Sequence, residues 1–277
     1  MSKKPTLAAA GLVLAMAGFA PAIASSPIAA GFNGSSLAAN DDGSTGQVST
    51  GFSMNFFGSS YSSLYVNNNG NVTFSAPQSA FTPYGLTGPL GQAIIAPFFA
   101  DVDTRGAGSG IVSYGTGTFD GMNAFGVNWP DVGYYYAASD KLDNFQLLLV
   151  DRTDTGAGNF DIYFNYGSMQ WETGDASGGS GGLGGSCAVA GYSNGSGTAG
   201  TNYQLPGSAV CGALIDGGSN ALQTATNDGT PGQFLFEVRN GQVQPPSSVP
   251  EPATVALLGL GLLGIGLARR RARLAGN

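Results

Sequence analysis

Apolar residues in the middle of the chain recur at every second position in short runs, separated by clusters of Gly, Ser, Asn and Thr. Phe52, Met54 and Phe56 alternate with polar residues, as expected for a strand with one buried face. Between the two terminal segments, no long stretch has the 3.6-residue apolar period of an amphipathic helix. The pattern therefore predicts strands and turns throughout, as in a sandwich or barrel.

A β-hairpin is expected from residues 64–66 and 72–74, because residues 67–70 between them read Asn-Asn-Asn-Gly, a turn sequence. Short runs rich in aromatic and β-branched residues predict seven further strands. They are residues 93–100, 110–114, 124–129, 133–137, 144–150, 159–165 and 234–238. The predicted fold class is all-β: an antiparallel sandwich-like domain with long Gly-rich loops.

The composition also predicts where this domain begins and ends. We place it at residues 46–241, after a flexible N-terminal segment at residues 25–45. Residues 174–201 are rich in Gly and Ser and are expected to form a long loop. Residues 242–249, which include two consecutive prolines, are typical of a spacer.

The first 24 residues have the three parts of a secretory signal peptide, which we expect to form a signal helix. Lys3 and Lys4 supply the basic start, and residues 7–19 form an apolar stretch too short for a stable membrane span. Ala22 and Ala24 then provide the small side chains that signal peptidase requires, so Ser25 is expected to be the first mature residue.

A second apolar segment lies near the C-terminus. Residues 253–268 are apolar except for Thr254, and the basic cluster at residues 269–273 follows directly. Sixteen helical residues extend roughly 24 Å, somewhat short of the bilayer core of about 30 Å. We therefore expect a single, marginal transmembrane helix. Its arginines place the C-terminus in the cytoplasm and the domain outside.

This tail resembles the PEP-CTERM sorting signal of Gram-negative bacteria. Pro250, Glu251 and Pro252 precede the apolar helix, and Arg269, Arg270 and Arg271 follow it. In that family, an exosortase in the inner membrane recognises the tail and is thought to release or transfer the protein to the cell surface. The resemblance implies a transient inner-membrane anchor at residues 250–273, then location at the surface or in the extracellular matrix. An ordinary single-span tail anchor is the alternative.

Charge and cysteine content narrow the choice of partners. Four basic and sixteen acidic residues lie between the terminal signals, so the exported part carries a net charge of −12. Such a surface repels nucleic acid and anionic lipid. Cys187 and Cys211 are the only cysteines, and in an oxidising compartment we expect them to form a disulfide.

Several blocks in the predicted domain resemble the NIDO domain of nidogen and α-tectorin. They are residues 96–106, 144–149 and 164–174, together with the opening hairpin, and the likeness covers residues 52–217. That family is extracellular, occurs in matrix and adhesion proteins and has no accepted enzymatic activity. The resemblance implies surface interaction without naming a ligand.

Two carboxylates near the end of a predicted strand are candidates for a Ca²⁺ site. Asp101 and Asp103 are two residues apart and would point to the same side of the strand. Asp151, Asp154 and Asp161 are candidate neighbours. The alternative is that Asp101 and Asp103 cap a turn or pair with Arg105, because the ligand spacing of an EF-hand is missing.

Aromatic residues offer a second candidate site. Trp129, Tyr134 and Tyr136 can provide a stacking platform for glycans, with Tyr134 and Tyr136 on one face of a strand. Core packing is the alternative for each of them.

Catalysis is not expected. The chain has no histidine, which removes the commonest general base and the Ser-His triad, and nothing fixes a carboxylate pair at glycosidase spacing. The sequence predicts a non-catalytic surface or matrix protein that acts by adhesion or structural interaction in an exopolysaccharide or biofilm layer. Other surface proteins are further candidate partners, and a carbohydrate-binding module is the alternative function.

Overall fold

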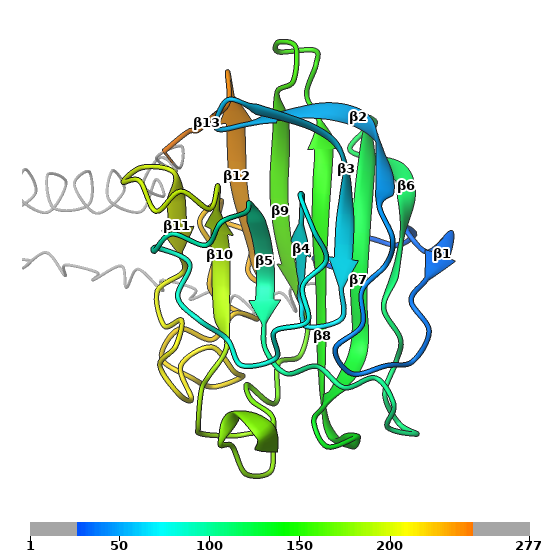
Figure 1. Cartoon of the computed structure of the whole chain (residues 1–277), viewed down its shortest axis with the longest axis vertical. Coiled ribbons are helices and arrows are strands. Elements are labelled where there is room, and N and C mark those ends of the chain that lie inside the picture. Colours follow the sequence, from blue (N-terminus) through cyan, green and yellow to red (C-terminus); the bar gives the residue numbers. More distant parts are fainter. Residues whose placement is uncertain (1–26, 246–277) are drawn as a thin grey trace, which may run out of the picture.

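The computed structural model describes residues 27–245, which form two antiparallel β-sheets packed face to face (Figure 1). The seven-stranded sheet has the order β1-β6-β7-β8-β9-β12-β13. Its strands are β1 (Ser35–Ser36), β6 (Ser113–Phe119), β7 (Met122–Tyr134), β8 (Ala138–Asp151), β9 (Phe160–Tyr166), β12 (Gln233–Arg239) and β13 (Gln242–Val243). The all-β, sandwich-like prediction is confirmed for these residues.

The second sheet has six strands in the order β11-β10-β5-β4-β3-β2. They are β2 (Val48–Phe56), β3 (Ser59–Asn67), β4 (Asn71–Thr73), β5 (Ile94–Phe99), β10 (Val189–Ser193) and β11 (Asn202–Gln204). The predicted hairpin is present, since β3 and β4 pair antiparallel across the Asn-rich turn. The 3-10 helix η1 (Asp175–Ser177) adds one short helical turn.

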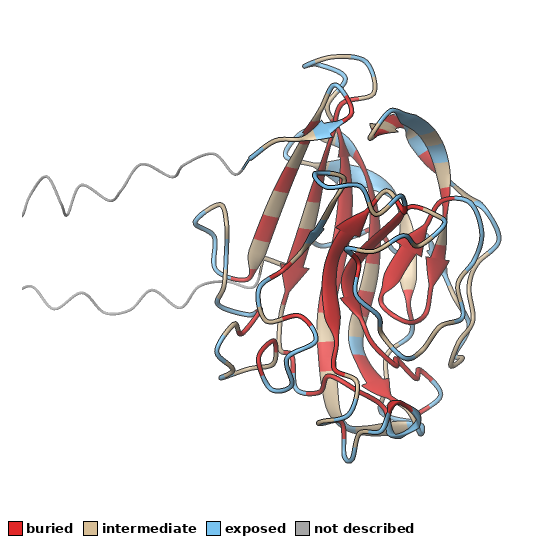
Figure 2. Ribbon diagram, turned by 60° about the vertical axis from the view of Figure 1, so that its left-hand side comes forward, coloured by how far each residue is buried: buried red, intermediate tan, exposed pale blue. Residues whose placement is uncertain are grey.

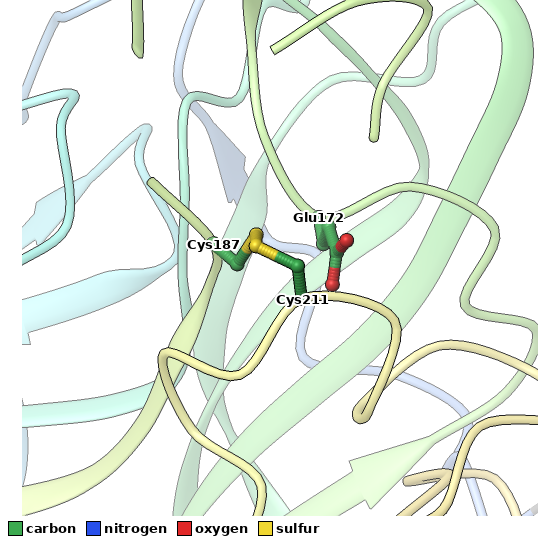
Figure 3. Close-up of side chains that lie close together, drawn as sticks. All are labelled: Glu172, Cys187 and Cys211. Carbon is green, nitrogen blue, oxygen red and sulfur yellow. A yellow bond between two sulfur atoms is a disulfide. The ribbon is translucent and has the colours of Figure 1, made fainter. Parts of the chain in front are cut away.

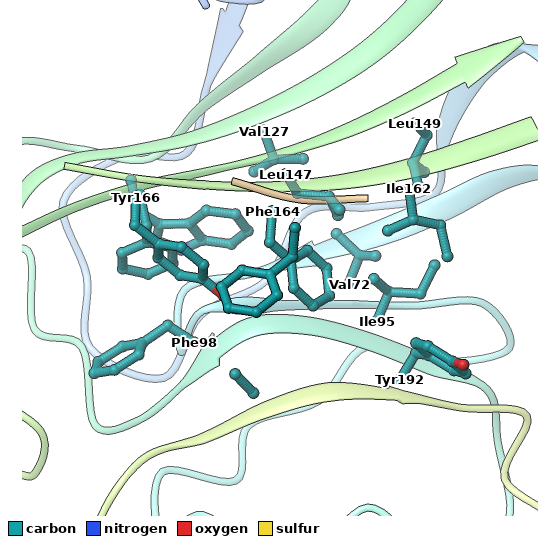
Figure 4. Close-up of a cluster of buried hydrophobic side chains, with 14 of the residues drawn as sticks. Val72, Ile95, Phe98, Val127, Leu147, Leu149, Ile162, Phe164, Tyr166 and Tyr192 are labelled. Atoms are coloured by element: carbon teal, nitrogen blue, oxygen red, sulfur yellow. The ribbon is translucent and has the colours of Figure 1, made fainter. Parts of the chain in front are cut away.

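The main core lies between the two sheets. Val72 and Ile95 of the smaller sheet face Leu147, Ile162 and Phe164 of the larger one, and none of these side chains is exposed (Figure 4). Burying such side chains is the principal source of stability, at about 25 cal/mol per Å² of apolar surface. The alternating pattern read from the sequence therefore corresponds to the inward faces of the strands.

Strand β5 is buried on both faces, which explains the uninterrupted apolar run around it. Ile95 points into the main core, whereas Ile94 and Phe99 pack in a second cluster with Leu86 and Val189. All six residues of β5 are buried, and Figure 2 shows that strands in the middle of the molecule are buried along most of their length. The segment after β5 consequently begins inside the molecule.

The prediction of a long loop at residues 174–201 is wrong for the middle of that range, which contains a strand. Strand β10 occupies Val189–Ser193, lies between β5 and β11, and is buried throughout. The strand is short and is flanked by Gly-rich stretches, so the composition of the whole segment indicated a loop.

The prediction of a flexible segment at residues 25–45 is wrong for the part described. Phe32 is buried against the outer face of the larger sheet with Leu148 and Val150, and β1 pairs with β6. The backbone of Ala29 exchanges two hydrogen bonds with the side chain of Gln146. The domain therefore begins earlier than residue 46.

The domain also ends later than predicted. Strand β13 pairs with β12, and Gln244 N–H donates to the Glu237 carbonyl, so the first residues of the expected 242–249 spacer belong to the sheet. No helix within residues 27–245 is long and apolar enough to cross a membrane. The predicted signal helix and transmembrane helix lie outside the described residues.

Candidate functional site

Three carboxylates from two distant segments meet at one end of the sandwich. Asp41 and Asp42 lie between β1 and β2, and Asp101 follows β5. One oxygen from each lies within 4.8 Å of the others. They border a cavity of about 170 Å³, which is lined by Asp41, Asp42, Phe81, Asp101, Tyr135 and Ala176.

Two asparagines of the β3–β4 turn hold the two segments together. Asn68 Nδ2 donates to the carbonyls of Asp41 and Val102, each at 2.6 Å. Asn69 Nδ2 donates to Asp42 Oδ1 at 2.8 Å, and its Oδ1 accepts the Val102 N–H. Both side chains are buried, so this turn is a polar brace inside the protein and not a solvated loop.

Asp101 is the most unusual member of the cluster. Its side chain is buried, with 1% of the residue exposed, and Oδ2 has no hydrogen-bond partner among the described residues. Gly174 packs directly on Oδ2, where a Cβ would collide with it. Burial and the charges of Asp41, Asp42 and Asp103 raise the pKa of Asp101 to about 7.

Asp41 has a similar environment. Burial and the charges of Asp103 and Asp42 raise its pKa to about 6, although Arg105 acts in the opposite direction. Its Oδ2 accepts from the Arg105 guanidinium at 3.0 Å, whereas its buried Oδ1 has no partner within residues 27–245. The cavity thus contains carboxylate oxygens that no neighbouring donor satisfies.

Asp103 does not share this cavity, so the predicted pairing of Asp101 with Asp103 as Ca²⁺ ligands is wrong. Asp103 accepts from Arg105 Nε and Nη2, at 2.8 and 2.6 Å, and from the backbone N–H of Ala137. Burial favours a higher pKa for Asp103, but these hydrogen bonds hold it below its usual value. The alternative, pairing with Arg105, is confirmed for this residue.

The other acidic residues proposed as neighbours lie elsewhere. Asp161 bridges Arg152 and Arg239 at 2.8 and 2.6 Å, and Asp154 pairs with Arg152. Asp151 accepts the N–H of Thr153 in the turn after β8. These contacts make an ion-pair cluster at the β8–β9 turn and not a cation site.

Comparison with known proteins identifies the domain. The profile of the nidogen-like domain matches residues 62–119 and 113–240, which together cover more than half of the chain. The chain belongs to the NIDO family. The PEP-CTERM protein-sorting motif matches residues 248–271.

Curated relatives support the family assignment, and they match this chain over only a small part of their own length. α-Tectorin of Mus musculus and of Homo sapiens are each 34% identical to this chain over 227 residues, covering 74% of the chain and 10% of the tectorin. Nidogen of Drosophila melanogaster is 30% identical over 211 residues, covering 67% of the chain and 14% of nidogen. The NIDO chain thus matches only a small part of these relatives. No solved structure matches it.

The aromatic site predicted in the NIDO domain is largely wrong. Trp129 is buried, stacks on Phe145 with ring centroids 5.0 Å apart, and donates from Nε1 to the Asn68 carbonyl. Tyr134 is also buried, and its hydroxyl donates to Asp140. Because β7 ends at Tyr134, Tyr136 does not share its face. It is 72% exposed, the only one of the three available to a ligand.

The expected disulfide of the NIDO domain is present. Cys187 and Cys211 are bonded, with their Cα atoms 5.3 Å apart. Glu172 lies beside them and accepts the Gly212 N–H with both carboxylate oxygens (Figure 3). Because both sulfurs are oxidised, this trio cannot provide thiolate ligands to a metal. Its role is to fix the loops around β10.

The terminal signals lie outside the described residues. The cleavage residues and the sorting residues therefore stay predictions from the sequence; they are Ala22, Ala24 and Ser25, and Pro250, Glu251, Pro252, Arg269, Arg270 and Arg271. The motif match covers the sorting residues. Sequence reasoning missed Asp41 and Asp42, which lie in a segment expected to be flexible, and the Asn-Asn-Asn run was the only signal for the brace beside them.

Proposed function

We propose that this protein is a non-catalytic surface or matrix component, sorted by an exosortase, that acts by adhesion or structural interaction. The observation that supports it is the presence of a NIDO domain and a PEP-CTERM motif in one chain. The two matches indicate an exported extracellular protein, and the motif implies exosortase processing during export. The described part of the domain has a packed two-sheet core and no histidine, which fits an interaction role.

Action within an exopolysaccharide or biofilm layer follows from the same family resemblance. The acidic exported part favours neutral polysaccharide, surface proteins or cations as partners over nucleic acid. Signal peptidase and exosortase are the expected partners during export, and the inner membrane holds the chain only until the sorting tail is processed.

The sorting step is tested in the producing bacterium with Glu251→Ala, and with Ser247→Ala as the matched control just before the motif. We expect the wild type and the control to reach the surface or matrix without the apolar tail, as measured by fractionation and intact mass. Glu251→Ala should remain in the inner-membrane fraction with its tail, as should the wild type in a strain lacking the exosortase. Equal processing of all forms in both strains would refute the proposal.

A further inference from the structure

The Asp101 carboxylate lacks the partners that a buried acidic group normally has. Its Oδ2 is buried without a hydrogen bond among the described residues, and it borders the cavity that Asp41 and Asp42 also line. Burying a polar group without a partner costs about 1–3 kcal/mol, and more when it is charged. Such groups in native proteins usually have a ligand, a metal or a water. The Asp101 side chain lines the cavity, and one of its oxygens lies in the cluster with those of Asp41 and Asp42.

The spacing of the oxygens fits a single ion. Ca²⁺ binds oxygen ligands at about 2.3–2.6 Å, so two ligands of one ion lie at most about 5 Å apart. The three carboxylate oxygens lie within 4.8 Å of one another. All three can therefore coordinate one cation without moving their backbones, and the cavity beside them leaves room for water ligands.

The local charge is also unbalanced. Asp41, Asp42, Asp101 and Asp103 interact with one another, and Arg105 is the only cation that pairs with any of them within residues 27–245. Arg105 forms its ion pairs with Asp103 and Asp41, and it acts on Asp101 only from a greater distance, so neither Asp42 nor Asp101 has an ion-pair partner within residues 27–245. Like charges at this separation repel strongly when they are partly desolvated. A divalent cation would remove this repulsion.

We propose that Asp41, Asp42 and Asp101 bind one divalent cation, with Ca²⁺ preferred. The donors are all oxygens, which excludes a preference for soft or thiolate-binding metals. Ca²⁺ tolerates irregular, partly hydrated coordination, whereas Mg²⁺ demands a near-octahedral shell. The ion would fasten the segment before β2 to the end of β5. This site is independent of the sorting function proposed above.

The proposal is tested on the full-length chain, purified in mild detergent and stripped of metals with EDTA. Calorimetric titration with CaCl₂ should show one ion per chain with a Kd at or below about 1 mM, the range of extracellular modules. At about 100 times the Kd, Tm should rise by about 5 to 10 °C relative to EDTA. Titration with MgCl₂ should give weaker binding.

Asp101→Asn and Asp42→Asn each remove one charge with almost no change in shape, and each should weaken Ca²⁺ binding at least tenfold. Asp42 is less buried than Asp101, so its variant covers the case in which Asp101→Asn does not fold. Asp120→Asn is the control, because Asp120 is exposed at the β6–β7 turn and does not line the cavity. Absence of saturable binding to the wild type, unchanged affinity in both cavity variants, or an equal loss in the control would overturn the proposal.

Discussion

Phe32 packs directly on Gly126, so that a Cβ at position 126 would collide with the phenyl ring. The contact fastens the N-terminal segment to the outer face of the seven-stranded sheet, where Phe32 is buried. A glycine is required here by the close approach and not by backbone conformation. The pair provides a direct test of whether this segment is part of the folded domain.

Gly126→Ala should lower the free energy of unfolding by about 1–3 kcal/mol, because overpacking forces Phe32 to shift. Phe32→Ala should cost about 3–5 kcal/mol. In the Phe32→Ala background, Gly126→Ala should cost less, because Cγ and Cδ1 of Phe32, two of the three atoms nearest to the added methyl, are gone, while Cβ stays. Denaturant unfolding of the four proteins measures this coupling. An equal cost of Gly126→Ala in both backgrounds would show that Phe32 does not lie there.

The same segment illustrates what could not be predicted from sequence. Ala29, Phe32 and Leu37 lie in short apolar stretches without strand or helix periodicity, yet all pack on the domain. Nothing local distinguishes them from residues of a flexible leader. By contrast, strands such as β2 and β9 were predictable because alternation or a buried apolar run is a local property of the sequence.

The cavity was half predictable for a related reason. Asp101 was predictable as a candidate ligand because it follows a buried strand. Its partners Asp41 and Asp42 were not, because the sheet order and the Asn68–Asn69 brace bring them to it. The Asn-rich turn was expected from composition, and it is a turn. That its side chains point inward is a tertiary property, since turn residues normally face solvent.

The disulfide permits a second prediction about stability. Reducing Cys187–Cys211 should lower the free energy of unfolding by about 3 kcal/mol, because a loop of roughly 25 residues regains its freedom in the unfolded chain. Thermal unfolding with and without reductant measures the loss. The variant Cys187→Ala/Cys211→Ala should already show the lower Tm and should not respond to reductant. A response in that variant would mean that the reductant acts at some other place.

The buried carboxyl group of Asp143 should make the stability of the protein depend on pH. It is completely buried and accepts the N–H groups of Gln170 and Trp171 with Oδ1, while Oδ2 has no partner within residues 27–245. Burial raises its pKa well above the usual value, against these two hydrogen bonds, and the charges of Asp216 and Glu172 add to the rise. The folded state therefore holds this proton more tightly than the unfolded chain does.

The sign of the effect follows from that difference. Stability from this group is complete below about pH 4 and is lost as pH rises toward the folded-state pKa, by up to about 1.4 kcal/mol per pH unit. Asp143→Asn keeps the acceptor for both N–H groups and cannot ionise. Its free energy of unfolding relative to the wild type should therefore increase with pH, as measured by urea unfolding from pH 4 to 8. A difference between Asp143→Asn and the wild type that stays flat from pH 4 to 8 would contradict the prediction.

Trp129 and Tyr136, once candidates for the same glycan surface, should now behave differently. Trp129→Ala should lower the free energy of unfolding by about 3–5 kcal/mol, because it removes the stack on Phe145 and the hydrogen bond to Asn68. Tyr136→Ala should change it by less than about 0.5 kcal/mol, since the ring is mostly exposed.

If exopolysaccharide binds by ring stacking, Tyr136→Ala alone should reduce the retention of the protein in a pull-down with exopolysaccharide while the fold is unchanged. Val210→Ala, which removes another exposed apolar side chain, is the control and should bind as the wild type does. Saturable retention that is equal in the wild type and in Tyr136→Ala would exclude stacking at this residue and favour a protein partner or a different face of the domain.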